Sequence, residues 1–117
     1  MATRKPKKDP ELEVREKIAE MSDRDRRIAE PLHDLIRAAA PELSPKLWYS
    51  QPAYARDGKV VVFFRGADVD KERYLTLGFT GDARLDEGNI WPTAYAVTAL
   101  GGAEEKLIAD LVKRAAG

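Results

Sequence analysis

The sequence predicts an α+β fold: an antiparallel sheet of about four strands, with two N-terminal helices and one C-terminal helix packed on it. Apolar residues recur at the spacing of helices near both ends of the chain and at the spacing of strands in the middle. The segments between the strands are too short for parallel crossovers. The 117 residues leave room for a single domain, which we expect to span residues 9–117.

Residues 1–8 predict a disordered basic tail, because a proline and like charges stand where a helix or strand would show apolar periodicity. No apolar run follows this polar start as it would in a secretory signal peptide, so we expect a cytoplasmic protein. The 20 basic and 20 acidic residues balance, which argues against nucleic acid as a partner. No stretch approaches the roughly 20 apolar residues that span a bilayer, so we expect no membrane partner. We also expect the protein to be a monomer or a weak homodimer.

Two helices are expected before the sheet. Asp9 and Pro10 form a helix start, and this first helix should run to about Met21. Ser22 should cap the second helix, with Asp25 in the capping-box position three residues on. The second helix continues its apolar pattern across Pro31, where we expect a kink, and its core-facing stripe is Ile28, Leu32, Leu35, Ile36 and Ala39.

The strands begin after Pro45. The pair Asp57-Gly58 stands between two β-like runs, residues 47–54 and Lys59–Arg65, and predicts a hairpin with a type I′ turn. The second run is apolar on both faces, with Val60, Val62 and Phe64 on one and Val61 and Phe63 on the other, which predicts an interior strand. We therefore expect Val61, Val62 and Phe63 to be nearly inaccessible.

The rest of the chain completes the sheet and adds the last helix. Residues 66–71 read as a loop, residues 73–79 as the third strand, residues 81–89 as a polar loop and residues 93–100 as the fourth strand. Gly101 and Gly102 end that strand before a helix whose expected inward side chains are Leu107, Ile108, Leu111 and Val112.

No known catalytic or metal-ligand motif is visible in the sequence. The chain has no cysteine, no phosphate-binding glycine loop, no G-x-S-x-G elbow and no H-E-x-x-H pair, so we expect no catalytic residue, no metal site and no cofactor. His33, the only histidine, lies off the apolar stripe and is expected to be solvated. The acidic residues Asp68, Asp70 and Glu72 lack the glycine and closing glutamate of a calcium loop and predict a solvated loop.

Amphipathic aromatic residues are the one unusual concentration. We expect a non-catalytic binding module for a small organic ligand or a peptide, with a cleft lined by Trp48, Tyr49, Gln51, Tyr54 and Trp91. Arg73 or Lys71 could pair with an acidic group of that ligand. The alternative is that the same aromatic side chains are simply part of the core.

Several segments carry a resemblance to a known family: L-I-R-A-A-A-P-E-L, K-L-W-Y-S-Q-P-A-Y, A-R-D-G-K-V-V-V-F-F, V-D-K-E-R-Y-L-T-L-G-F and W-P-T-A-Y-A-V. The chain resembles the YdhG-like family from Met21 to the last helix. The resemblance implies a small α+β domain, often labelled frataxin-like or iron chaperone, and most members have no established activity.

Two alternatives to a ligand-binding module stay open. The first is a frataxin-like iron chaperone, for which the first helix offers acidic side chains interleaved with basic ones: Glu11, Glu13, Glu16 and Glu20. No iron-binding residue carries over by motif. The second is a hydrolase that uses Ser50, which would require a base near that hydroxyl in the fold.

Overall fold

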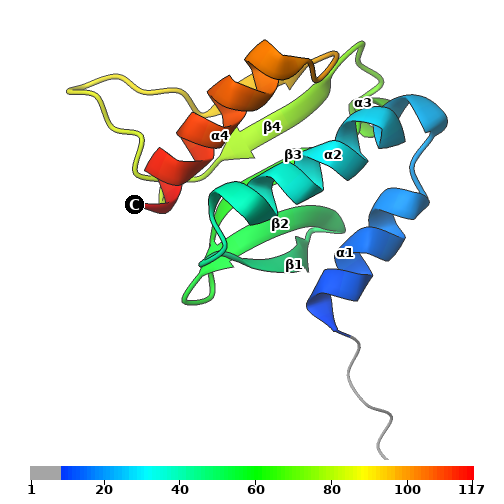
Figure 1. The fold of residues 1–117 in the computed structure, drawn as a ribbon, viewed down its shortest axis with the longest axis horizontal. Helices are drawn as coiled ribbons and strands as arrows, with labels where there is room; N and C mark the ends of the chain where they lie inside the picture. The colour runs from blue at the N-terminus through cyan, green and yellow to red at the C-terminus, as the bar shows by residue number, and fades with distance from the viewer. Residues whose placement is uncertain (1–8) are drawn as a thin grey trace, which may run out of the picture.

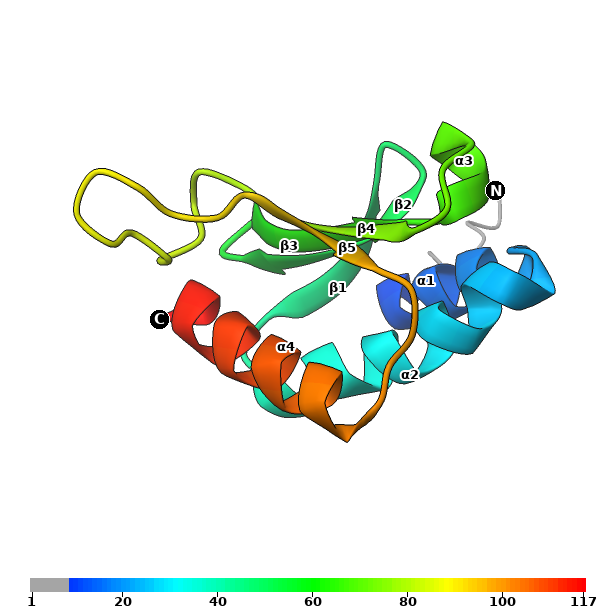
Figure 2. The same cartoon turned by 90° about the horizontal axis from the view of Figure 1, so that it is seen from above.

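A five-stranded antiparallel sheet carries helices from both ends of the chain on one of its faces (Figure 1 and Figure 2). The structure is a computed structural model that describes residues 9–117, so the predicted tail lies outside the described residues. The elements follow one another as α1 (Pro10–Ala19), α2 (Asp23–Ala39), β1 (Ser44–Trp48), β2 (Gln51–Arg56), β3 (Lys59–Arg65), α3 (Ala67–Asp70), β4 (Leu75–Phe79), β5 (Ala94–Val97) and α4 (Gly102–Ala116). The predicted fold class is confirmed, with one strand more than expected.

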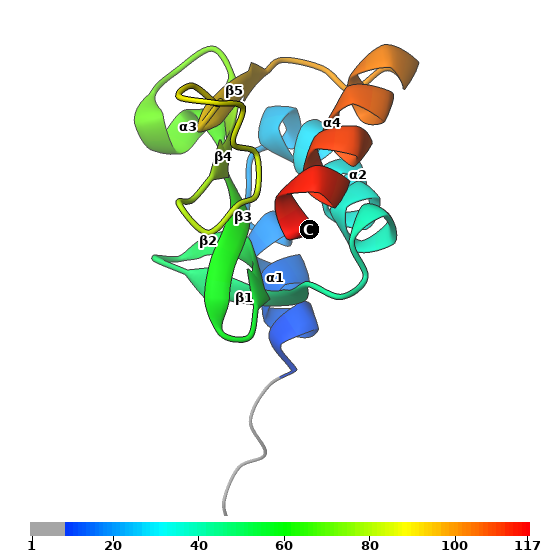
Figure 3. The ribbon, with the colours of Figure 1, turned by 90° about the vertical axis from the view of Figure 1, so that its left-hand side faces the viewer.

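The sheet is a simple meander in which each strand pairs with the next one along the chain, in the order β1-β2-β3-β4-β5. Helices α1, α2 and α4 cover one face, as the end-on view shows (Figure 3). The main core lies between that face and the helices, and its largest buried side chains include Leu32, Ile36, Tyr54 and Phe64. None of the helices within residues 9–117 is long and apolar enough to cross a membrane.

Both N-terminal helices start where the capping residues predict. The Asp9 carboxylate accepts a hydrogen bond from the Glu11 amide at 3.0 Å, and the Ser22 hydroxyl accepts one from the Asp25 amide at 3.3 Å. The first helix ends at Ala19, two residues before the predicted end, and α2 continues through Pro31. The other half of the predicted capping box is replaced, because the Asp25 carboxylate contacts α3 instead of the backbone of Ser22.

The extra strand comes from a turn within the run that was predicted as one strand. Tyr49 and Ser50 both have positive φ angles, 52° and 62°, and the two residues turn the chain so that Trp48 pairs with Gln51. Positive φ at both central positions is the signature of a type I′ hairpin turn. Neither tyrosine nor serine favours that conformation, so no residue preference marked the turn in the sequence.

The predicted Asp57-Gly58 turn and the interior position of β3 are confirmed. The register between β2 and β3 shifts at Tyr54 and Ala55, so Val61 is an extra residue between the paired Val60 and Val62. This bulge turns both Val61 and Val62 into the main core, whereas Phe63 points to the other face and is only partly buried. The prediction that Val61 and Val62 lie on opposite faces was wrong, as was the prediction of an inaccessible Phe63.

Three smaller differences concern the second half of the chain. The loop expected at residues 66–71 contains the short helix α3, and both β4 and β5 are shorter than predicted. Helix α4 turns Ile108, Leu111 and Val112 inward as expected, but Leu107 is 53% exposed. That exposure arises because Ala115 and Ala116 share the buried face of α4, which therefore lies farther round the helix than predicted.

Candidate ligand-binding site

The sequence-predicted aromatic residues do not converge on one cleft. Tyr54 is fully buried in the main core, and Tyr49 is 84% exposed at its turn. Trp48 stands at the end of β1, one edge of the sheet, and Trp91 precedes β5 at the other edge. Arg73 is exposed in the segment before β4. Only Gln51, from this set, lines the pocket described next.

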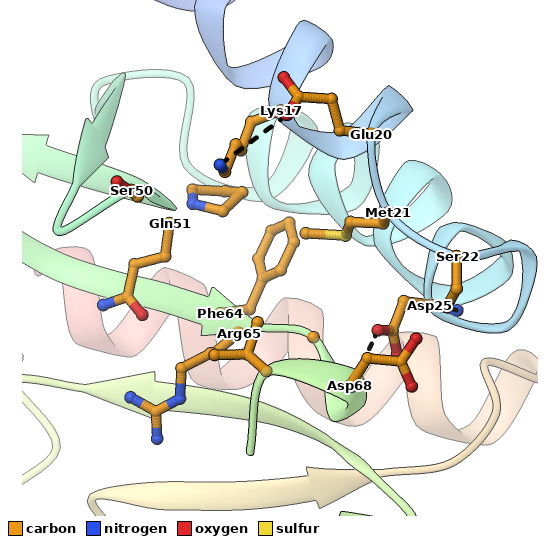
Figure 4. Close-up of a pocket in the computed structure, with 13 residues that line it drawn as sticks. Lys17, Glu20, Met21, Ser22, Asp25, Ser50, Gln51, Phe64, Arg65 and Asp68 are labelled. Atoms are coloured by element: carbon orange, nitrogen blue, oxygen red, sulfur yellow. Dashed lines mark hydrogen bonds and ion pairs between the residues drawn. The ribbon is translucent and has the colours of Figure 1, made fainter. Parts of the chain in front are cut away.

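That pocket, of about 300 Å³, lies where the end of α1, the start of α2, the β1–β2 turn and α3 meet (Figure 4). Its apolar lining consists of Met21, Pro52, Phe64 and Val69. Its volume is at the lower end of the range of about 300–1,000 Å³ that small-molecule sites occupy. Polar side chains from several elements stand around this lining, so the pocket combines apolar walls with polar groups as small-molecule sites do.

The β1–β2 turn contributes Ser50 to the pocket, and the first residue of β2 contributes Gln51. Ser50 holds its unfavourable backbone conformation on the rim, whereas the Gln51 side chain is mostly buried, at 8% exposure for the residue. Non-glycine residues at positive φ cost about 1–3 kcal/mol and are found more often at functional sites than elsewhere. The strained turn therefore adds a reason to regard this pocket as the functional one.

Helix α3 is anchored to α2 by a buried carboxylate. Asp25, 2% exposed, accepts hydrogen bonds from the Ala67 amide at 2.9 Å and the Asp68 amide at 3.2 Å. Gly66 makes this approach possible, because a Cβ atom at that position would lie 2.6 Å from an Asp25 carboxylate oxygen. The wall of the pocket formed by α3 is thus held in a fixed place relative to α2.

Two carboxylates of the predicted acidic loop, Asp68 and Asp70, form hydrogen bonds with arginine side chains. The Asp68 carboxylate accepts a hydrogen bond from Arg24 at 2.6 Å, and Asp70 accepts one from Arg65 at 2.7 Å. The hydroxyl of Ser22 and the Arg24 guanidinium hold the pKa of Asp68 below its usual value. Both carboxylates already have cationic partners, which leaves little reason for a metal ion to bind them.

His33, predicted to be solvated, is fully buried. Its Nδ1 lies 2.7 Å from the Tyr54 hydroxyl and its Nε2 lies 3.0 Å from the Glu11 carboxylate. Burial raises the pKa of Tyr54, so the phenol keeps its proton and its O–H can donate a hydrogen bond to Nδ1 while Nε2–H donates one to Glu11. The missed signal is Ala29, four residues earlier and also buried, which widens the inward face of α2 to include His33.

Trp91 lines a separate, more open groove of about 440 Å³ between the segment before β5 and α4. Ile90, Tyr95 and Leu111 also line this groove, and Arg114 forms an ion pair with Glu87 at 2.6 Å beside it. The groove lies at the opposite edge of the sheet from the β1–β2 turn. Trp91 and Gln51 therefore cannot contact the same small ligand.

Few side chains in the structure support the two alternative functions, an iron chaperone and a hydrolase that uses Ser50. Within residues 9–117 no three metal-binding side chains lie close enough together to hold a metal ion. Glu11 is paired with Arg15, and Glu20 lies 4.0 Å from Lys17. No hydrogen bond among the described residues joins Ser50 to an acid or a base. Comparison of the chain with protein families, with curated proteins and with solved structures found no match.

Proposed function

We propose that this protein is a binding module for a small organic molecule, which it holds in the pocket between α1, α2, α3 and the β1–β2 turn. One observation carries the proposal: apolar side chains line a pocket whose lining also includes Lys17 of α1, Ser50 of the β1–β2 turn, Gln51 of β2 and Arg65 of β3. Apolar walls give a ligand its affinity, and a few converging polar groups fix its orientation.

The way the pocket is built supports a preformed site. Asp25 fixes α3, and Pro52 stiffens the start of β2 beside Gln51, whose side chain is mostly buried. A site that is already ordered loses less conformational entropy when a ligand binds, so even a small molecule can be bound.

A peptide is the second candidate ligand, and it would bind the Trp91 groove. Ile90 and Trp91, which line this groove, are exposed in the segment before β5, which is an edge strand, and exposed apolar side chains next to an edge strand suit an extended peptide. The pocket has the stronger support, because it brings more polar groups together around an apolar lining.

A fragment screen on the isotope-labelled protein tests the proposal. We expect fragments to shift the amide resonances of α3 and the β1–β2 turn and to raise the melting temperature, since they bind only the folded state. Val69, 71% exposed on α3, lines the pocket, so Val69→Trp should fill its mouth and abolish binding. Ile90→Trp, a matched change at another exposed β-branched residue, should leave binding unchanged.

Three outcomes would contradict the proposal. Fragments that bind Val69→Trp as well as they bind the unmodified protein would place the site elsewhere. Loss of binding in Ile90→Trp alone would favour a peptide or other ligand in the Trp91 groove. A screen in which no fragment shifts the pocket resonances would leave packing as the only role of these side chains.

A further inference from the structure

The carboxylates that line the pocket already have partners. Both oxygens of Asp25 accept hydrogen bonds from backbone amides, and Asp68 accepts one from Arg24. Glu20, with its side chain 70% exposed, stands at the rim beside Lys17. The acceptor groups of the pocket are therefore mostly engaged by the protein itself or turned to solvent.

The donor groups of the same pocket are less engaged. Among residues 9–117, the carboxylate oxygen nearest to Lys17 Nζ, from Glu20, lies at 4.0 Å, which is beyond hydrogen-bond range. Arg65 bonds Asp70 through Nε, and no bond within residues 9–117 uses its two terminal nitrogens. The side-chain amide of Gln51 likewise forms no hydrogen bond with the side chains or backbone of residues 9–117. The groups still able to bind are thus chiefly donors, two of them cationic.

The donor groups of the pocket stand along one side of its central apolar side chains. In Figure 4 the polar ends of Lys17, Gln51 and Arg65 lie to the left of Met21 and Phe64, with Lys17 above, Gln51 between and Arg65 below. A carboxylate needs charged donors and an apolar body needs dry contacts, and the lining of the pocket includes both.

We infer that the ligand is a small organic acid, an inference that rests on the proposed function. Its carboxylate lies on the side of the pocket where Lys17, Gln51 and Arg65 present their polar ends, and its apolar body lies against Met21, Pro52 and Phe64. Arginine and lysine are both suited to carboxylates, arginine through a pair of parallel N–H groups and lysine as a compact charge. The nearby Asp70 holds the Arg65 side chain by Nε, which leaves the terminal nitrogens to a ligand.

Matched pairs of acids and amides test this inference: benzoate with benzamide, phenylacetate with phenylacetamide, and hexanoate with hexanamide. Each pair keeps the apolar body and removes the charge, so binding followed by calorimetry and by amide resonances reports on the carboxylate alone. We expect the acid of at least one pair to bind in the pocket about tenfold or more tightly than its amide. This ratio of affinities corresponds to the usual free energy of a hydrogen bond to a charged group.

The variants Lys17→Gln and Arg65→Gln should each weaken binding of the acid and leave that of the amide nearly unchanged. Lys113→Gln removes the same charge from an exposed site on α4, outside the pocket, and should have no effect. Added salt should weaken the acid more than the amide, because it screens the charges. The melting temperature of each variant shows that it is folded, and Lys17→Gln, at a half-exposed side chain, keeps the test valid if Arg65→Gln unfolds.

The outcomes separate this inference from the proposed function. Amides or other neutral fragments that bind the pocket as tightly as acids would overturn the inference and keep the proposed function. Acids that bind equally well to Lys17→Gln and Lys113→Gln would also overturn it. If neither acids, amides nor other fragments shift the pocket resonances, both the inference and the proposed function fail.

Discussion

The ring of Phe63 lies directly over Gly78 on the face of the sheet that no N- or C-terminal helix covers. An added Cβ atom at Gly78 would stand 2.2 Å from the ring, far inside van der Waals contact. Phe63 also packs edge-on against Trp48, with ring centroids 5.2 Å apart. These two rings shield a small second cluster of Ala53, Ala55 and Val60, so this face is closed by aromatic side chains instead of by a helix.

We expect Gly78→Ala to lower the free energy of unfolding by about 1–3 kcal/mol, because the new methyl group must displace the Phe63 ring. Chemical denaturation measures the change. Gly81→Ala is the matched control, since Gly81 has open space around its Cβ position and its φ is not positive. Equal stability of the two variants would show that Phe63 moves aside at no cost.

At the scale of the elements, the β1–β2 hairpin combines a stable register with an unfavourable turn. Type I′ turns prefer asparagine or glycine because both central residues take positive φ, and here the residues are Tyr49 and Ser50. The other hairpin has Asp57 and Gly58 at the same positions. The comparison of the two hairpins indicates that Tyr49 and Ser50 occupy the β1–β2 turn for a reason other than the stability of the turn.

The double variant Tyr49→Asn, Ser50→Gly should therefore be more stable than the unmodified protein, by about 1–2 kcal/mol, since it relieves two strained residues. Urea denaturation gives the difference. Asp57→Asn, at a turn whose residues already suit it, should change stability much less. A double variant of unchanged or lower stability would mean that contacts of Tyr49, such as its edge-on packing against Trp48, outweigh the backbone strain.

The elements that the sequence predicted are those marked by a local signal. Asp9 and Ser22 marked the helix starts, Asp57-Gly58 marked a turn, and the run of valines and phenylalanines marked β3. The missed features depend on contacts between distant residues. The bulge at Val61, the Tyr49-Ser50 turn and the buried His33 are all decided by how the sheet meets the helices, which no short pattern records.

The candidate site shows the same division. Gln51 was predicted as a ligand-binding residue. The other residues that line its pocket come from distant segments of the chain: Lys17 and Arg65, for example, are 48 positions apart in the sequence. The aromatic residues were predicted to line a ligand site because they combine a large apolar surface with a polar group. In the structure, Tyr54 packs in the main core and Trp48 packs on the other face of the sheet. A pocket formed where a helix end, a turn and a short helix meet has no pattern of its own in the chain.

At the scale of the whole molecule, Glu11 connects α1 to the rest of the fold. Its carboxylate bonds His33 of α2 at 3.0 Å and Arg15 at 3.2 Å, and lies 3.6 Å from Arg37 Nε, while His33 in turn contacts Tyr54 of β2. The end of α1 supplies Lys17 to the pocket. The contacts of Glu11 therefore hold one wall of the candidate site as well as the helix itself.

Stability should depend on pH through Glu11. Although burial alone would raise it, the hydrogen bond from His33 and the charges of Arg15 and Arg37 lower the pKa of Glu11 below its ordinary value of 4.5. The unfolded state then binds a proton more readily than the folded state, so this stabilising contribution is complete above pH 4.5 and is lost as the pH falls through the lowered pKa. Glu11→Gln should lower the free energy of unfolding by about 1–3 kcal/mol at neutral pH, because a charge-assisted hydrogen bond is lost. The same variant should make the free energy of unfolding fall less steeply as the pH is lowered into the acidic range. Urea denaturation at a series of pH values measures both effects, with Glu42→Gln, at an exposed position outside the helices and strands, as the control. If Glu11→Gln and Glu42→Gln lose stability in parallel as the pH falls, the acid dependence arises from other carboxylates and Glu11 does not hold α1 in place through its charge.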